Sequence, residues 1–438
     1  MKVIFSLLLI CVASLKAVSI HVFKKQGDNS APTLLLMGGI QGDEPGGFNT
    51  TNIFLMHYKI LSGNVWVVPV LNRYSMLRNH RGVYGDLNRK FAYISRHDPE
   101  YALIQSIKAT IMDSEVNVIL HLHDGSGFYR PSYQSALLNP KRWGNSFIID
   151  QEELPHVKFG HLGRISRNTT HHINQFLLKS LHRHYIRNTH TARGDKEMEK
   201  ALTYFAIRHK KPAFAHEASK ELPLNERVYY HLLAIEGLMQ QLGITYTKDF
   251  TLKPANLYRL INDKTLTLTL NQNILLPLYG LRPQLKFFPF PKHVAIDKNS
   301  LDSQSYILGL LPHKNQIWLK YGNKLMTRLT PLYLNFDHSL RDIQIEVDGQ
   351  IKTATPASIL EVKEAFKVLP KEGYRVNVIG FSLNDGKKLP NEVGVSIAYK
   401  DLEKKFSIDR QGKIYRIEIY KNHAFSGMVL VRFIYNAL

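Results

Sequence analysis

Between about residues 19 and 245, short apolar runs alternate with helical patterns, and this alternation constrains the fold more than any other feature of the chain. The runs are apolar almost throughout, which is typical of central strands covered by helices on both faces. The alternation predicts an α/β fold with a mixed, mostly parallel sheet flanked by helices. Strands are expected at 33–40, 65–72, 116–124 and 213–218.

Three segments in the same half have helical spacing: 101–114, 172–187 and 225–242. The third is the clearest, because its apolar residues form one stripe that ends just before Gly243. Asn225 and Gly243 are expected to cap this helix. We assign the apolar stripes of all three helices to the core.

After Thr245 the sequence changes to short strand-like runs separated by turns that contain Pro, Asn or Asp-Gly. This pattern predicts two smaller all-β domains. The first is a β-barrel-like domain over 246–336, and the second is an immunoglobulin-like β-sandwich over 337–438. The sequence has no internal repeat and no low-complexity segment.

Residues 1–17 predict a secretory signal peptide. Lys2 precedes an apolar stretch from Val3 to Ala13, and a small-residue cleavage site ends at Ala17. A lipid anchor on Cys11, the only cysteine, is the less favoured alternative because no small residue precedes it. A buried N-terminal strand is also less favoured, because the run is longer than most strands. We therefore expect a soluble protein exported to the periplasm, with an α/β domain over 18–245.

The chain is strongly basic, with 57 Lys and Arg against 36 Asp and Glu and a formal net charge of +21. Such a charge attracts anionic polymers: nucleic acid, lipid head groups or acidic glycan. The sequence contains no nucleic-acid-binding motif and no apolar run of about 18 residues, so neither nucleic acid nor a transmembrane anchor is expected. The His- and Arg-rich stretch 171–193 is either a solvated basic face or a contact surface for anionic glycan.

Two segments at expected strand ends carry metal-ligand residue types. Gln41 and Glu44 lie three apart in a glycine-rich turn after the first strand. His121 and His123 lie on one face of another strand, and Asp124 follows as a possible partner of His123. The ordinary alternatives are a turn with solvated side chains and, above all for His121, a core histidine.

Two further segments carry groups suited to binding or catalysis. Arg81, Asn88 and Arg89 provide donors that can grip a carboxylate. Glu217 ends an apolar run, where burial would raise its pKa. Each segment alone is also compatible with a surface sequence or with a paired strand-end carboxylate.

Taken in chain order, the four segments resemble the zinc metallocarboxypeptidase family, the carboxypeptidase A-like or M14 peptidases. That family has His-x-x-Glu after its first core strand, then an Arg, an Asn-Arg pair, a strand-end His and a late catalytic Glu. The resemblance covers about residues 19–245 and implies a carboxypeptidase-like fold. The matching residues are Gln41, Glu44, Arg81, Asn88, Arg89, His123 and Glu217.

The resemblance implies a Zn²⁺ ion held by Gln41, Glu44 and His123, where the open position takes a water. It also implies that Glu217 is the general base and that Arg81 stabilises the oxyanion.

Substrate contacts follow from the same resemblance. Asn88 and Arg89 are implied to bind the terminal carboxylate of the substrate. The family has a Tyr ahead of the catalytic Glu that closes over the substrate, and Tyr204 is the candidate in the right order.

One departure from the family pattern is the amide of Gln41 in place of the first His ligand, for which weaker zinc binding is expected. With Gln41 at this position, a signal peptide and two β domains, the chain is similar to the DL-carboxypeptidases that determine cell shape in helical Gram-negative bacteria. The implied reaction trims the uncrosslinked peptidoglycan (murein) tripeptide to a dipeptide and releases its terminal meso-diaminopimelate. The implied partners are muropeptides, with the β domains contacting the wall or periplasmic proteins.

Two alternatives stay open. The aspartoacylase or succinylglutamate desuccinylase type of deacylase shares the core fold and a similar turn, but acts in the cytoplasm, against which the signal peptide argues. A non-catalytic peptidoglycan-binding protein with a decayed metal site is the other. Retention of Glu44, His123 and Glu217 argues against decay.

Overall fold

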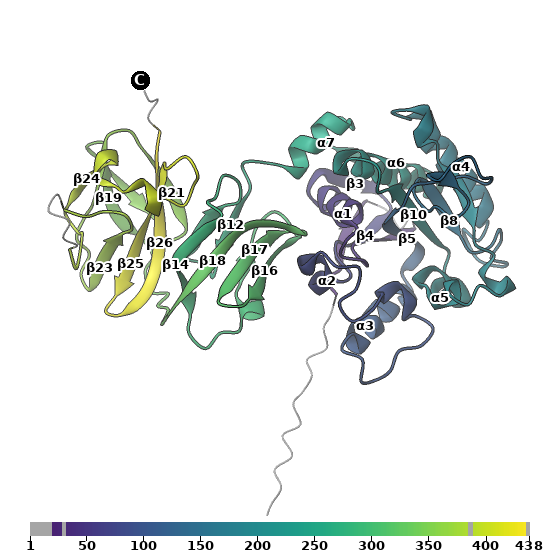
Figure 1. Cartoon of the computed structure of the whole chain (residues 1–438), viewed down its shortest axis with the longest axis horizontal. Coiled ribbons are helices and arrows are strands. Elements are labelled where there is room, and N and C mark those ends of the chain that lie inside the picture. The colour runs from purple at the N-terminus through teal and green to yellow at the C-terminus, as the bar shows by residue number, and fades with distance from the viewer. Residues whose placement is uncertain (1–19, 29–31, 384–388, 435–438) are drawn as a thin grey trace, which may run out of the picture.

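The computed structural model describes residues 20–28, 32–383 and 389–434, so the predicted signal peptide and Cys11 lie outside the described residues. Three units lie in a row: an α/β unit, a middle β unit and a C-terminal β unit (Figure 1). In the part of the chain that the structure describes, no helix has the length and apolar character needed to cross a bilayer.

The α/β unit is built on a seven-stranded sheet of order β1-β4-β2-β5-β10-β8-β9. Pairing is parallel except at β1–β4 and β10–β8. The mixed, mostly parallel sheet is thereby confirmed, and β2, β4, β5 and β10 correspond to the four predicted strands. The strands are β1 (Phe23–Gln26), β2 (Thr33–Met37), β4 (Asn64–Val68), β5 (Val116–Gly125), β8 (Ser146–Ile149), β9 (Tyr185–Asn188) and β10 (Ala213–Ser219), with small pairs β3 (Tyr58–Ser62) with β11 (Thr245–Lys248) and β6 (Phe128–Tyr129) with β7 (Leu138–Asn139).

Helices cover both faces of this sheet, as the apolar strands require (Figure 1). Helices α1, α4 and α6 pack on one face, and α3 and α5 on the other. The helices are α1 (Pro45–His57), α2 (Arg73–Arg78), α3 (Tyr101–Met112), α4 (Leu162–Gln175), α5 (Leu202–Arg208), α6 (Leu224–Leu242) and α7 (Pro254–Ile261).

The predicted helix over 172–187 is wrong. Helix α4 ends at Gln175, and β9 already begins at Tyr185. The helix over 225–242 is confirmed as α6, which Gly243 ends with a left-handed φ of 71°. Its N-cap is Pro223 and not Asn225, whose side chain instead donates to the Pro254 carbonyl.

The α/β unit also extends beyond the boundary expected at residue 245. Strand β11 pairs with β3, and Leu257 and Ile261 of α7 are buried in the same core as α6. Burial of these apolar side chains holds the segment to the first unit.

The middle unit is made of short strands in a four-stranded sheet, β14-β18-β17-β16, and a three-stranded sheet, β13-β12-β15. Its core also takes in Phe48 of α1 and Met76 and Leu77 of α2. The middle unit is therefore packed directly on the α/β unit. Its strands are β12 (Thr267–Leu270), β13 (Ile274–Pro277), β14 (Gln284–Pro291), β15 (Leu301–Asp302), β16 (Leu308–His313), β17 (Gln316–Tyr321) and β18 (Lys324–Leu334).

The C-terminal unit consists of two four-stranded sheets, β20-β19-β22-β24 and β21-β26-β25-β23, which form the expected sandwich. Strand β26 alternates between two cores: Val429 and Val431 face the sandwich, and Met428 and Leu430 face the middle unit. The strands are β19 (Ile343–Val347), β20 (Gln350–Ala354), β21 (Ser358–Val362), β22 (Ala365–Val368), β23 (Tyr374–Val378), β24 (Ser396–Ala398), β25 (Ile414–Lys421) and β26 (Ala424–Phe433).

Candidate active site

The candidate site lies at the carboxyl ends of β2, β5 and β10, where open α/β sheets bind ligands. Gln41 and Glu44 follow β2 in the turn into α1, and both side chains are buried. A Cβ added at Gly42 would lie 2.1 Å from the backbone carbon of Ser75. Glycine is therefore needed at this position for the turn to pack against α2.

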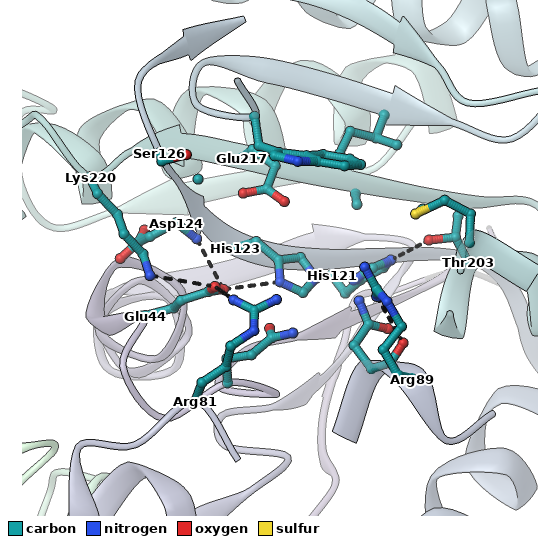
Figure 2. Close-up of a pocket in the computed structure, with 17 residues that line it drawn as sticks. Glu44, Arg81, Arg89, His121, His123, Asp124, Ser126, Thr203, Glu217 and Lys220 are labelled. Atoms are coloured by element: carbon teal, nitrogen blue, oxygen red, sulfur yellow. Dashed lines mark hydrogen bonds and ion pairs between the residues drawn. The ribbon is translucent and has the colours of Figure 1, made fainter. Parts of the chain in front are cut away.

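His121 and His123 lie together near the end of β5. His123 Nδ1 is 3.1 Å from Glu44 Oε2, and His123 Nε2 is 2.6 Å from His121 Nδ1. His121 Nε2 is 2.8 Å from the Thr203 hydroxyl, and burial lowers the pKa of His121 well below its usual value. His121 is thus a neutral, satisfied histidine, whereas His123 faces the carboxylate of Glu44 (Figure 2).

Glu217 lies on β10 beside His123, because the two residues are register partners in the parallel β5–β10 pair. Burial raises the pKa of Glu217 to about 7, with His123 opposing the shift and Glu44 adding to it. Figure 2 shows its carboxylate pointing into the same space as His123 and Arg81. A carboxylate with this pKa can both take up and return a proton near neutral pH.

Arg81 lies across the pocket from Glu217 (Figure 2). Its Nη1 donates to Glu44 Oε1 at 3.0 Å, and its Nε donates to Asp86 Oδ2 at 3.0 Å. Asp86 Oδ1 accepts from Gln41 Nε2 at 2.9 Å. Asp86 therefore orients both the guanidinium of Arg81 and the amide of Gln41.

Asn88 and Arg89 lie on a short 3₁₀ turn, Leu87–Arg89, which Asp86 caps by accepting from the Asn88 backbone N–H. Asn88 Oδ1 accepts from the Leu202 amide at 2.9 Å. The Arg89 guanidinium donates to the Asn88 carbonyl at 3.1 Å. These bonds hold both side chains at one end of the pocket.

One cavity of about 220 Å³ brings together all but one of the predicted site residues. Tyr204 is the exception. It is half-buried on α5 and does not line the cavity, whereas its neighbour Thr203 does. The predicted residues in the cavity wall are Gln41, Glu44, Arg81, Asn88, Arg89, His123 and Glu217.

The cavity also contains residues that the sequence analysis missed. Lys220, just after β10, places its Nζ 3.1 Å from Asp43 Oδ2 and 3.8 Å from Glu44 Oε1. Trp143 lines the wall, and the Arg187 guanidinium lies 3.6 Å from its ring centroid. Lys220 follows a predicted strand and could have been found by its position, whereas nothing in the sequence marks Trp143.

Asp124 does not contact the His123 ring, contrary to expectation. Its carboxylate turns to the N-terminus of α1, where the helix dipole favours an anion. Its backbone N–H donates to Glu44 Oε2 at 3.2 Å, so Asp124 ties the Glu44 turn to β5. Its carboxylate accepts from Gly46 N (2.8 Å), Arg227 Nη1 (2.8 Å) and His231 Nε2 (3.2 Å).

The donor set of Gln41, Glu44 and His123 fits a metal ion. Gln41 Oε1 is buried and, among the described residues, has no hydrogen-bond partner, while Asp86 holds its Nε2. A buried carbonyl oxygen is normally hydrogen-bonded, and a cation beside it would meet that need. Within the described ranges no three His, Cys, Asp or Glu residues are arranged to hold a metal, because here an amide provides the third donor.

A mixed α/β sheet that places this donor set, a buried carboxylate and several guanidinium groups in one pocket fits a metallocarboxypeptidase. The chain belongs to the family of carboxypeptidases controlling helical cell shape, whose catalytic model matches residues 1–262. Models for the β-barrel domain and the C-terminal domain of these metallo-carboxypeptidases match residues 263–335 and 336–434. This membership favours the carboxypeptidase over the deacylase and the non-catalytic binder.

Solved structures similar to the chain include the apo form of Csd4, a cell shape determinant protein from Helicobacter pylori. It is 52% identical, covers 95% of this chain and 100% of its own, and has a TM-score of 0.91. The tripeptide-bound Csd4 structure gives the same values. The mDAP-bound form of Csd4, described as a D,L-carboxypeptidase, is 52% identical over 94% of this chain and 100% of its own, with a TM-score of 0.91. A search of the curated proteins finds no match.

Proposed function

We propose that the protein is a zinc-dependent DL-carboxypeptidase that trims the uncrosslinked murein tripeptide to a dipeptide by releasing meso-diaminopimelate. The single observation that carries the proposal is the meeting of Glu217 with Gln41, Glu44 and His123 in one cavity. The 52% identity to Csd4, a D,L-carboxypeptidase with tripeptide-bound and mDAP-bound structures, supports the substrate class. Trimming of this kind would modify the cell wall and so cell shape.

Gln41, Glu44 and His123 would hold the zinc ion. Zinc, when bound, supplies Lewis acidity that lowers the pKa of water and polarises a carbonyl group. Gln41 would contribute its amide oxygen, which Asp86 keeps free by binding Nε2. A neutral amide oxygen is a weaker zinc ligand than an imidazole, so we expect weaker binding than at a site with a histidine here.

Glu217 acts as the general base. It takes a proton from the attacking water as the new C–O bond forms, and it passes that proton to the leaving amine as the C–N bond breaks. Its pKa of about 7 suits both steps. Arg81 donates to the scissile oxygen as that atom gains negative charge, in exchange for its contact with Glu44.

Asn88 and Arg89 bind the terminal carboxylate of the substrate. A guanidinium can hold a carboxylate by two parallel hydrogen bonds, and an internal peptide bond offers no such anion. This contact would restrict the enzyme to chain ends. Tyr204 is proposed as a further substrate contact because it adjoins Thr203, which lines the cavity.

We further propose that residues 1–17 are a signal peptide and that the mature protein works in the periplasm. The two β domains, expected over 246–336 and 337–438, would dock the enzyme to the wall or to periplasmic protein partners. The full chain has a net charge of +21, and removal of Lys2 and Lys16 with the signal peptide would leave +19, which supports attraction to an anionic polymer.

The test is the release of diaminopimelate from purified tripeptide by the zinc-loaded mature protein. Glu217→Ala is expected to abolish release while zinc content stays near one per chain. The control is Glu221→Ala, which removes an exposed glutamate outside the cavity. Release that survives Glu217→Ala, or no release by the unaltered protein, would overturn the proposal.

A further inference from the structure

A second cavity lies between the middle β unit and the C-terminal sandwich. Its volume is about 750 Å³, against about 220 Å³ for the catalytic cavity, and the two have no lining residue in common. One side is formed by residues 282–287 and Leu332, and the other by 377–381, 403–408 and β25. Cavities of this size at domain interfaces are common ligand sites.

The wall of this interdomain cleft is mainly apolar and aromatic. Leu285, Phe381 and Tyr420 are buried in it, whereas Phe287 at its edge is 65% exposed. Phe287 lies in a bulge of β14, between Leu285 and Phe288, with a φ of +51°. A bulge re-aims a side chain, and a left-handed φ is unfavourable for phenylalanine, so the backbone here is strained to present this ring.

A buried ion pair lines the inner part of the cleft. Arg416 is 5% exposed and Glu418 is 2% exposed, with Arg416 Nη1 3.2 Å from Glu418 Oε1. Tyr420 donates to the other carboxylate oxygen at 2.7 Å. The Arg416 guanidinium also donates to the Lys286 and Phe287 carbonyls at 3.3 and 3.4 Å. Arg416 Nε and, apart from the ion pair, Glu418 Oε1 have no hydrogen-bond partner among the described residues.

These two atoms define what a ligand has to supply. A buried polar atom without a hydrogen bond costs free energy even when the rest of its charged group is paired, so an occupant that satisfies both atoms is favoured. A ligand carboxylate would pair with Arg416, and a ligand ammonium group would pair with Glu418. Lys286 adds an exposed cation at the cleft, and no ion pair to its ammonium occurs in the part of the chain that the structure describes.

We propose that the interdomain cleft binds the free end of a diaminopimelate side chain: an ammonium and a carboxylate on one carbon, carried by an aliphatic stem. The carboxylate meets Arg416 and Lys286, the ammonium meets Glu418, and the stem packs on the apolar wall. The choice of this amino acid rests on the proposed function. Because crosslinking acylates this amine, the cleft selects uncrosslinked stem peptides.

Such a site would act alongside the catalytic cavity. A wall polymer displays many identical stem peptides, so a second binding site raises the effective concentration of substrate at the first. The enzyme would thereby be retained on wall regions that are rich in uncrosslinked peptide.

Equilibrium dialysis with synthetic murein tripeptide tests the inference, using the zinc-loaded full chain with Glu217→Ala to prevent turnover. Two peptides per chain are expected. In the same Glu217→Ala chain, Arg416→Met and Glu418→Leu are then introduced together, so that both charges are removed at once. One bound peptide per chain is expected to remain. Lys286→Ala, at an exposed position, is expected to weaken only this site by at least threefold. The inference is overturned if the Glu217→Ala chain binds only one peptide, or if it still binds two after Arg416→Met and Glu418→Leu.

Two further arms separate this inference from the proposed function. Arg89→Ala should remove the other bound peptide, and hydrolysis by the unaltered enzyme tests the reaction on its own. Tripeptide acetylated on the terminal amine of diaminopimelate should bind the cleft at least tenfold more weakly. Equal binding of the two peptides at the cleft would refute the role of Glu418.

Discussion

Asp124→Asn is the substitution that most directly tests how the site is held together. Asparagine keeps the size of the side chain but removes its charge, so Arg227 loses its anionic partner at 2.8 Å. Breaking a buried ion pair costs about 3–5 kcal/mol. Because the Arg227 side chain is 15% exposed, the lower limit of about 3 kcal/mol applies here.

This loss should be visible as a fall in Tm. A change of 1 kcal/mol shifts Tm by roughly 2–4 °C in a domain of this size, so a fall of roughly 6–12 °C is expected. Trp66 and Trp143 report on the α/β unit by fluorescence, once Trp318→Phe has removed the signal of the middle unit. A fall of less than about 3 °C would show that the carboxylate contributes little.

The same substitution should also weaken zinc binding. The Asp124 carboxylate accepts from the Gly46 N–H, two residues after Glu44, and weakening of such supporting contacts typically lowers metal affinity by about 10–100-fold. Chelator competition measures the affinity. The matched control is Asp124→Asn with Arg227→Met, which removes both charges and should recover most of the lost Tm but not the zinc affinity. Equal zinc affinity in the single variant and the unaltered protein would contradict the positioning role.

Three other outcomes are expected. Gln41→His should tighten zinc binding in the same chelator assay, because an imidazole nitrogen replaces an amide oxygen; unchanged or weaker binding would count against Gln41 as a ligand. Burial raises the pKa of Glu217 to about 7, and a general base acts in its deprotonated form. We therefore expect kcat/KM to rise with pH through a midpoint at or below 7. A flat profile from about pH 5 to 8 would contradict the role of Glu217 as the base. Lys220→Met should lower the free energy of unfolding by less than about 1 kcal/mol, because its ion pair with Asp43 is one-third exposed, and a larger loss in a urea titration would show a buried role.

The sheet could be predicted because strand burial leaves a local signal. Residues 33–37, 116–120 and 213–215 are almost wholly apolar, and the candidate site residues come toward or just after the ends of the same strands. The helix over 172–187 was predicted from apolar residues at helical spacing, but Ile173, Leu177 and Ile186 reach the core of the α/β unit without one continuous helix. There the chain leaves α4 and returns as β9.

The contacts that position the site could not be predicted, because they join residues far apart in the sequence. Asp124 meets Arg227 and His231 of α6, more than 100 residues further on. Asp86 orients Gln41 and Arg81, but nothing in the sequence around Arg81 and Asn88 marks it for that role. Spacing rules find ligands on one strand or turn, but the groups that orient them depend on tertiary packing.

Packing between the units also bears on what the middle β unit does for catalysis. Phe48 and Met76, on the two helices next to the Gln41–Glu44 turn, are fully buried in the core of the middle unit, and Lys320 donates to the Leu77 carbonyl at 2.6 Å. Exposing a large apolar side chain costs about 1.5–3 kcal/mol, so the two exposures alone would cost about 3–6 kcal/mol. That is a large share of the 5–15 kcal/mol by which folded proteins are typically stable. A chain ending after Ile261 should therefore lose hydrolysis of soluble tripeptide even though it keeps every predicted site residue. Unchanged turnover by that chain would show that the β domains serve only in docking.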